Sequence, residues 1–348
     1  MPEDKSFEQK MLQVMNNASL ALMLSVGHRT NLFDSISKLP PSSSTQIALS
    51  SGLNERYVRE WLGAMVTSKI IDYDHISGLY SISKEKADFL TPNGKYNFAS
   101  SMQFIPVLAY VEDHIVKCFL NGGGVPYELF NRFHEVMAEE SEQTVLSALI
   151  EKILPIVPES LEKLESGINV LDIGCGSGRA LNLMAEKFPN SSFIGYDISK
   201  EAIENAILKV RENGISNASF ENQDVSNFTK ENHFDLITAF DAIHDQADPQ
   251  KVLENIKKSL KPDGVFLMQD IRASSKLEEN MDHSLAPYLY AVSCLHCMTV
   301  SLSQGGKGLG AMWGKELAIE MLKNAGFSNI KVLELPHDPI NYYYVARV

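Results

Sequence analysis

The chain has 348 residues, of which 44% are hydrophobic and 22% charged, a composition typical of a globular protein with room for two ordinary domains. Its formal net charge is -13, and so acidic a chain is repelled by the phosphates of nucleic acids and by anionic membrane headgroups. The composition therefore argues against a general nucleic-acid or membrane-surface protein and favours a small or neutral partner.

The start of the chain and its apolar runs predict a soluble, cytoplasmic protein. The sequence begins Met-Pro-Glu-Asp-Lys and lacks the basic segment, apolar core and small-residue cleavage site of a signal peptide. Its apolar runs are interrupted well short of the roughly 20 residues that cross a bilayer. Four cysteines in a chain of this length fit reduced thiols.

Cys294 and Cys297 have the CxxC spacing of a metal site. The sequence offers no second pair to complete a tetrahedral site, and the two cysteines lie in an apolar run typical of buried packing. We therefore expect structural thiols and no metal.

The first predicted domain, residues 1–95, has the pattern of a winged helix. A helix, a turn containing Gly52 and Asn54, and a second helix give helix-turn-helix spacing, and two short β-prone runs then form a hairpin. The helical segments are predicted at residues 7–26, 45–50 and 57–62, and the hairpin strands at residues 69–73 and 78–82.

The charges of this domain argue against a role in DNA binding. Residues 1–95 hold ten Lys or Arg and ten Asp or Glu, and in the second helix of the motif Arg56 and Arg59 are offset by Glu55 and Glu60. Phosphate contacts supply most non-specific DNA affinity, so a neutral domain is a poor candidate. We expect it to serve dimerisation instead.

Residues 96–165 are predicted to be a helical connector that contributes to the cover of the active site. The run Asn121-Gly-Gly-Gly124 interrupts it. Because no strand precedes these glycines, we interpret them as a flexible turn and not as a phosphate-binding loop.

A βαβ alternation begins near residue 168. An apolar strand at residues 169–173 leads into the turn Gly174-Cys-Gly-Ser-Gly178 and then into a helix. A second strand ends in Asp197, about twenty residues beyond the glycines, where a carboxylate in such a unit accepts hydrogen bonds from a ribose diol.

The details of the turn favour S-adenosylmethionine over a dinucleotide. Gly174, Gly176 and Gly178 occupy alternate positions behind Asp172, whereas a dinucleotide fingerprint has GxGxxG and serves a pyrophosphate. S-adenosylmethionine carries no phosphate. It presents an amino-acid zwitterion and a sulfonium, beside which an acidic residue is favourable.

Three further strands follow. The third, at residues 219–225, ends in Asp224, which could accept a hydrogen bond from an adenine amino group, and Val225, which could pack on the ring. The fourth covers residues 234–240 and leads into Asp241-Ala-Ile-His244-Asp245. The fifth, residues 265–270, follows a Lys-Pro-Asp-Gly turn and ends in Asp270.

These motifs resemble those of the class I S-adenosylmethionine-dependent methyltransferases. The resemblance rests on Val-Leu-Asp-Ile-Gly-Cys-Gly-Ser-Gly at residues 170–178, on Asp197 and Asp224, and on the Lys-Pro-Asp-Gly turn. It covers about residues 165–348. With the winged helix in front, the whole chain is similar to small-molecule O-methyltransferases that dimerise through such a domain.

The resemblance implies an α/β fold in which a Rossmann-like methyltransferase domain, residues 166–348, has a mostly parallel seven-stranded sheet. It also implies S-adenosylmethionine as cofactor, a small-molecule acceptor and a homodimer. The resemblance also implies that Ile198 and Phe240 bind the cofactor. Residues 330–335 and 342–347 are expected to form the closing antiparallel hairpin.

His244 is the candidate general base, since methyl transfer to a hydroxyl or thiol needs a proton removed near neutral pH. His244-Asp245 is similar to the His-Asp step of the family's O-methyltransferases, although Gln246 stands where an aromatic residue is usual. Asp270 matches an acidic residue that orients this histidine. The alternatives are a histidine that lines the pocket or caps a helix and an ordinary carboxylate at a strand end.

Residues 127–141 are similar to the helix that covers cofactor and acceptor in the family. Phe130, His134 and Met137 are the candidate substrate contacts, with plain core packing as the alternative, and Arg132 or His134 could meet an acidic acceptor. The Gly-rich segment at residues 304–310 is either a lid or a simple flexible loop.

Several functions remain open on the sequence. Oxygen is the favoured acceptor atom, with sulfur and nitrogen close behind. A DNA-binding regulator that senses S-adenosylmethionine and a cofactor-binding protein without catalysis are the alternatives, and the identity of the acceptor is not encoded in any motif.

Overall fold

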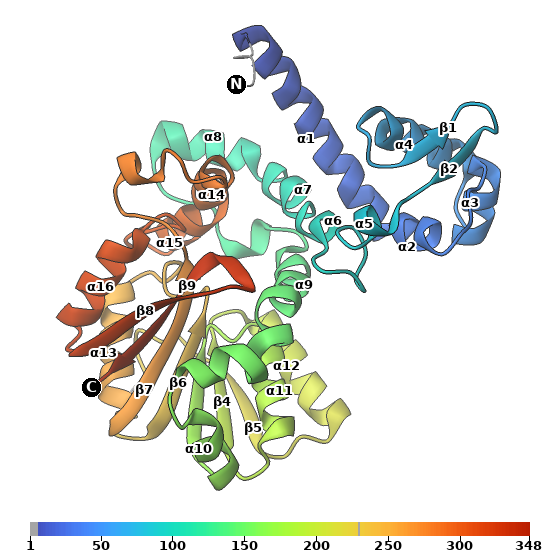
Figure 1. Ribbon diagram of the computed structural model, residues 1–348. Helices are drawn as coiled ribbons and strands as arrows, with labels where there is room; N and C mark the ends of the chain where they lie inside the picture. Colours follow the sequence, from blue (N-terminus) through green and yellow to red (C-terminus); the bar gives the residue numbers. More distant parts are fainter. Residues whose placement is uncertain (1–5, 229) are drawn as a thin grey trace. The chain divides into compact units, whose positions relative to one another are not determined.

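The computed structural model describes residues 6–228 and 230–348 and divides into two compact units, Met1–Ala109 and Tyr110–Val348 (Figure 1). In the described part of the chain, no helix is both long and apolar enough to cross a membrane.

The first unit is a winged helix built around Trp61. The Trp61 indole donates a hydrogen bond to the Met23 carbonyl at 2.8 Å, and its ring packs edge-on against Phe33. The hairpin follows the helices as predicted. The elements are α1 (Phe7–Arg29), α2 (Leu32–Ser37), α3 (Ser44–Ser51), α4 (Glu55–Thr67), β1 (Asp72–Asp74), β2 (Leu79–Ser81), α5 (Lys84–Ala87), α6 (Phe98–Ser101) and α7 (Phe104–Ala109).

Serine and asparagine side chains cap the starts of several helices of this unit. Ser6 and Ser43 each form a capping box with the glutamine three residues on, and the Asn54 side chain accepts from the first turn of α4. Along α4, Arg56 pairs with Glu60 and Arg59 with Glu55, so the basic side chains of this helix are neutralised within it.

The second unit opens with helical segments and continues into the sheet. The helical segments are α8 (Glu112–Asn121), η1 (Tyr127–Leu129), α9 (Phe133–Thr144), η2 (Leu146–Ala148), η3 (Leu149–Ile153), η4 (Leu154–Ile156) and α10 (Ser160–Ser166). The strands are β3 (Asn169–Ile173), β4 (Ser192–Asp197), β5 (Ala218–Asn222), β6 (Phe234–Phe240), β7 (Leu260–Ile271), β8 (Asn329–Leu335) and β9 (Asp338–Arg347).

These seven strands form one sheet in the order β5-β4-β3-β6-β7-β9-β8, in which only β9 runs antiparallel to its neighbours. The predicted mostly parallel seven-stranded sheet is confirmed, and so is the closing hairpin. Helices cover both faces: α10, α11 (Arg179–Lys187) and α12 (Lys200–Asn213) contribute to one buried core, and α13 (Pro249–Ser259) and α16 (Gly314–Asn324) to the other.

A helical insertion lies between β7 and α16. It contains η5 (Leu277–Asn280) and a run of three consecutive helical segments, α14 (Ala286–Val292), η6 (Ser293–Cys297) and α15 (Met298–Ser303). The middle segment, η6, is a π-helical turn. Such turns are rare and often occur at functional sites.

Most strand boundaries differ from the predicted ones by a few residues, and those of β5 and β7 have a clear physical reason. β5 ends at Asn222. The Asn222 side-chain amide donates to the carbonyls of Asp197 and Ile198, and the Asp224 carboxylate accepts from residues 226 and 227 in a local turn that competes with the ladder. β7 begins at Leu260, since Leu260 pairs with Phe234 and the Lys-Pro-Asp-Gly turn forms a bulge before Val265 pairs with Leu236.

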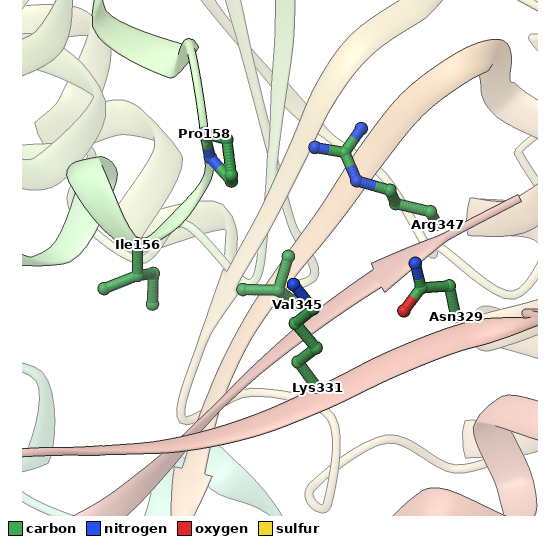
Figure 2. Close-up of a pocket in the computed structure, with 6 residues that line it drawn as sticks. All are labelled: Ile156, Pro158, Asn329, Lys331, Val345 and Arg347. Atoms are coloured by element: carbon green, nitrogen blue, oxygen red, sulfur yellow. The ribbon is translucent and has the colours of Figure 1, made fainter.

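A cavity of about 30 Å³ lies beside β8 and β9, with room for about one water molecule (Figure 2). It is lined by Ile156, Pro158, Asn329, Lys331, Val345 and Arg347. Because Arg347 pairs with Val265, in the first half of β7, this cavity lies at the end of the sheet opposite to the carboxyl ends of the parallel strands.

Candidate active site

The carboxyl ends of β3 and β6 meet at the point where the strand order reverses. The chain leaves β3 for β4 on one side and reaches β6 on the other, and ligands of open α/β sheets bind at such a switch point. A Cβ added to Gly174 would lie 2.4 Å from the Ala242 Cβ, so the turns that follow the two strands are in close contact. The predicted site residues should therefore gather here.

The glycine turn after β3 has a left-handed backbone, with φ of +68° at Gly174, +53° at Gly176 and +72° at Gly178. Gly178 caps the start of α11 and packs on Phe220. Gly176 differs, because no heavy atom lies within 4 Å of the place where its Cβ would be. The turn therefore presents its middle glycine to open space, as a backbone that is approached closely by a ligand would.

Asp197 joins the end of β4 to this turn. One carboxylate oxygen accepts from the Gly176 N–H at 2.8 Å and the other from the Ser199 N–H at 2.7 Å. Burial raises the pKa of the Asp197 carboxyl, and these backbone hydrogen bonds oppose the rise. The turn and the acidic residue predicted to bind a ribose are thus one connected unit.

Asp172 is buried on β3 beside the turn. Its carboxylate accepts a hydrogen bond from the Thr238 hydroxyl on β6 at 2.7 Å, as the register of the two strands requires. Burial raises the pKa of Asp172 to about 7, against the lowering effect of Thr238. A buried carboxyl of this kind is poised to accept a cationic group, whose charge would stabilise the ionised form.

The other predicted cofactor residues lie around this centre with different exposure. Asp224 is exposed and accepts from Ser226 and Asn227, while the Val225 side chain is part of the core. Ile198 is exposed at the end of β4, and Phe240 is half-buried at the end of β6.

His244 and Asp270 form the most sharply defined contact of the site. His244 Nδ1 lies 2.8 Å from Asp270 Oδ1, and both side chains are buried. The same oxygen accepts from the Trp313 indole at 2.9 Å and from the Ile271 N–H at 2.8 Å. Since these donors hold the carboxylate, Asp270 favours the neutral tautomer with the proton on Nδ1, in which Nε2 is the acceptor.

Two more carboxylates surround this histidine. Asp245 Oδ1 lies 3.3 Å from His244 Nε2, and Asp241 Oδ1 lies 3.9 Å from Nδ1. Burial lowers the pKa of His244, but Asp270 and Asp245 outweigh it and raise that pKa well above the ordinary value. Burial likewise raises the pKa of Asp241 to about 7. The resulting cluster of side chains is acidic and makes His244 a stronger base than a free imidazole.

Cys297 also faces this cluster. Its thiol lies in the same group as His244 and Asp245, with the possible ligand atoms within 4.8 Å of one another, and Asp241, His244 and Asp270 form a second such group. Both groups could hold a metal ion, and both would use the nitrogens of His244. Burial raises the pKa of Cys297 to about 12, so the thiol stays protonated. The absence of a metal site stays a prediction.

The three candidate substrate residues fall on η1 and α9 or beside them. His134 stacks on Tyr127 at 4.8 Å, and its Nε2 lies 3.3 Å from the Ser199 hydroxyl, next to Asp197. Phe130 is buried against His296, and Met137 is half-buried. Arg132 forms an ion pair with Glu135.

Sequence reasoning missed several residues that the fold brings to this site. Tyr127, Trp313, Cys297 and His296 come from segments far apart in the chain, and no spacing rule connects them with His244. The sequence around Cys294 and Cys297 predicted only buried packing and gave no sign that Cys297 lies beside His244. Asp241 and Asp245 could have been found, because they flank His244 on the loop after β6.

The Gly-rich segment at residues 304–310 is tied to its neighbours. The Lys307 N–H donates to the Ala247 carbonyl at 2.9 Å, and the Gly308 N–H donates to the Ser301 hydroxyl at 3.1 Å. Ala247 follows His244 on the same loop, so this segment contacts the loop that carries the proposed base.

Comparison with protein families identifies both parts of the chain. Residues 164–332 match the model of a methyltransferase domain, and residues 18–92 match that of the Rv2258c-like winged HTH domain. A ubiquinone biosynthesis O-methyltransferase of Actinobacillus pleuropneumoniae is 30% identical over 116 residues, which cover 32% of this chain and 48% of that protein. The chain spans about half the length of the first curated relatives it matches.

Solved structures extend the likeness to the whole fold. A protein of Nostoc punctiforme assigned to the O-methyltransferases superposes with a TM-score of 0.74 at 19% identity, covering 99% of both chains. Human N-acetylserotonin methyltransferase, solved in complex with S-adenosylmethionine, gives 0.70 at 17% identity and covers 100% of this chain and 99% of its own. At these identities the likeness shows a shared fold.

Proposed function

Since the chain belongs to the class I S-adenosylmethionine-dependent methyltransferases with an N-terminal winged-helix domain, we propose that it methylates a hydroxyl group of a small molecule, with His244 as general base. The observation that carries the proposal is the short contact between His244 and Asp270 in a buried acidic cluster beside the glycine turn.

The residues around the turn fit S-adenosylmethionine. Asp172 would accept from the cationic ammonium group, and Asp197 from the ribose hydroxyls through the lone pairs that Gly176 and Ser199 leave free. The open space beside Gly176 is where the cofactor can approach the backbone. Ile198, Asp224, Val225 and Phe240 would surround the adenosine.

Bound S-adenosylmethionine supplies an electrophilic methyl group. The chain must then align the acceptor oxygen and take up its proton as the new oxygen–carbon bond forms. His244 Nε2 would receive that proton. Asp270 holds the imidazole in place, and Asp245 and Asp241 stabilise the charge that the ring acquires.

We also propose that the protein acts as a homodimer through its first unit. Helix α1 leaves a stripe of apolar side chains exposed, spaced so that they share one face of the helix. The stripe consists of Phe7, Met11, Met15, Leu22 and Val26. Neutralised arginines on α4 argue against DNA as the partner of this unit.

Replacement of His244 tests the chemical role. We expect His244→Ala to lower the rate of methyl transfer about 10²- to 10⁴-fold, the usual contribution of a general base, with little change in affinity for S-adenosylhomocysteine. Transfer of labelled methyl to a panel of hydroxylated aromatic compounds measures the rate. The exposed His233, replaced in the same way, is the matched control. Full turnover by His244→Ala would show that another group takes the proton.

A further inference from the structure

His296 is a buried imidazole to which the proposed chemistry gives no role. It is 1% exposed, and in the described structure neither of its ring nitrogens has a hydrogen-bond partner. Buried polar groups are nearly always paired, so an imidazole left with two unpaired nitrogens calls for an explanation. One explanation is a ligand that supplies the missing hydrogen-bond partners.

Three aromatic rings surround the His296 imidazole. The ring stacks on Phe133 with centroids 3.6 Å apart and planes 8° apart, while Phe130 and Tyr127 approach it nearly at right angles. The π-helical turn η6 places His296 here and Cys297, the next residue, beside His244 and Asp245. One turn of helix thus contributes a residue to the aromatic cluster and another beside the proposed base.

The same aromatic cluster reaches the proposed cofactor site. Tyr127 contacts His296 on one side and stacks on His134 on the other, and His134 meets Ser199, which donates its N–H to Asp197. His296 therefore lies between the residues proposed to hold the cofactor and those proposed to take the proton, the region that a methyl acceptor must occupy.

The charge of this region limits which acceptor can bind. Burial holds the pKa of His296 well below its usual value, with the nearby charges of His244 and His134 acting in the same direction, so the ring is neutral and offers one donor and one acceptor. Asp241, Asp245 and Asp270 surround the neighbouring His244, and among the described residues they form ion pairs with His244 alone. A carboxylate or phosphate on the acceptor would be repelled.

We propose that His296 is an acceptor-binding residue and that the acceptor is a flat aromatic ring bearing a hydroxyl group and no negative charge. The ring would lie against the aromatic cluster, and His296 would exchange a hydrogen bond with one of its polar substituents. This inference rests on the proposed function, since it assigns the acceptor of that reaction.

Two matched compounds and one variant test it. The compounds are 2-naphthol and 6-hydroxy-2-naphthoate, which differ by one carboxylate, and their binding is titrated calorimetrically with S-adenosylhomocysteine present. We expect 2-naphthol to bind at least tenfold more tightly. His296→Phe keeps a ring that can stack on Phe133 and removes both nitrogens, so it should weaken 2-naphthol about tenfold, whereas His233→Phe should not.

A spectroscopic reading on the unaltered protein covers the case in which the variant does not fold. In protein labelled with ¹⁵N-histidine, the ring resonances of His296 should shift when 2-naphthol binds. Equal binding of the two compounds, an unaffected His296→Phe variant, unmoved resonances, or no naphthol binding beside bound S-adenosylhomocysteine would overturn the inference. Failure of the wild-type protein to bind S-adenosylhomocysteine would instead overturn the proposed function.

Discussion

At the scale of single residues, Asp270 determines how His244 behaves. Its Oδ1 contacts His244 Nδ1 and accepts hydrogen bonds from the Trp313 indole and the Ile271 N–H, so the carboxylate cannot rotate without breaking these contacts. The imidazole must lose its proton before it can act as a base. Because Asp270 and Asp245 overcome the effect of burial and raise the pKa of His244, the active form accumulates only on the alkaline side of its ordinary pKa.

This gives a prediction about pH. In the wild-type protein, kcat/KM should rise with pH through a pKa above 6.5, as His244 deprotonates. Asp270→Asn removes one of the two carboxylates that raise this pKa, so the rising limb should move to lower pH while kcat falls by about tenfold or more, because the tautomer is no longer enforced. Profiles measured from about pH 5 to about pH 10 would reveal the shift. An unchanged limb would mean that His244 does not govern the rate. Asp282→Asn, at an exposed position, is the control.

At the scale of elements, the glycine turn separates the demands of folding from those of binding. Gly178 packs on Phe220, where an added Cβ would lie 2.4 Å from the ring, whereas Gly176 faces open space. Both have the left-handed backbone that side chains resist. The same substitution at the two positions should therefore have different consequences.

We expect Gly178→Ala to lower the free energy of unfolding by about 2–5 kcal/mol, from left-handed strain and overpacking together. Gly176→Ala should cost about 1–2 kcal/mol and weaken S-adenosylhomocysteine binding at least tenfold, since the methyl group enters the proposed cofactor space. Gly214→Ala, in a left-handed and open turn after α12, is the control for strain alone. Denaturant unfolding and calorimetry measure the two effects. If Gly176→Ala bound the ligand like the control, the turn would not be the cofactor site.

The sheet could be predicted from the sequence because its signals are local. The apolar strand, the alternating glycines and Asp197 lie within about thirty residues, so together they predict the βαβ unit without any knowledge of the tertiary contacts. The boundaries of β5 and β7 could not be predicted, because they depend on a side-chain turn at Asp224 and on a bulge before Val265. The acceptor side of the site was beyond reach for another reason: the stacking of His296 on Phe133 joins segments far apart in the chain.

At the scale of the whole molecule, the exposed face of α1 is the feature that an isolated chain leaves unexplained. Phe7 is 75% exposed and Met15 61%, and an apolar stripe of this length on one helix is typical of an interface. The stripe belongs to the winged-helix unit. On α4 of the same unit, each of the two arginines is paired with a glutamate, so this helix offers no net positive charge to nucleic acid.

We therefore expect the protein to sediment as a dimer and Met15→Asp to shift it toward a monomer, because a carboxylate in a buried apolar interface must lose its hydration. Analytical ultracentrifugation at several concentrations would measure the mass. Asn17→Asp, on the face of α1 opposite to Met15, should leave the dimer intact. A wild-type protein that remains a monomer at all concentrations would refute the dimer, and a dimer unaffected by Met15→Asp would place the interface elsewhere.

The central claim is that this chain binds S-adenosylmethionine through the turn after β3 and the carboxylate at the end of β4. Calorimetric titration with S-adenosylmethionine and S-adenosylhomocysteine tests it most directly, with Asp197→Ala beside Asp282→Ala as the exposed control. Asp197 would bind the ribose and also holds the Gly176 and Ser199 amides, so its loss should weaken both ligands about a hundredfold or more while the control binds as wild type does. Absence of binding by the wild-type protein, or equal binding by Asp197→Ala, would contradict the account.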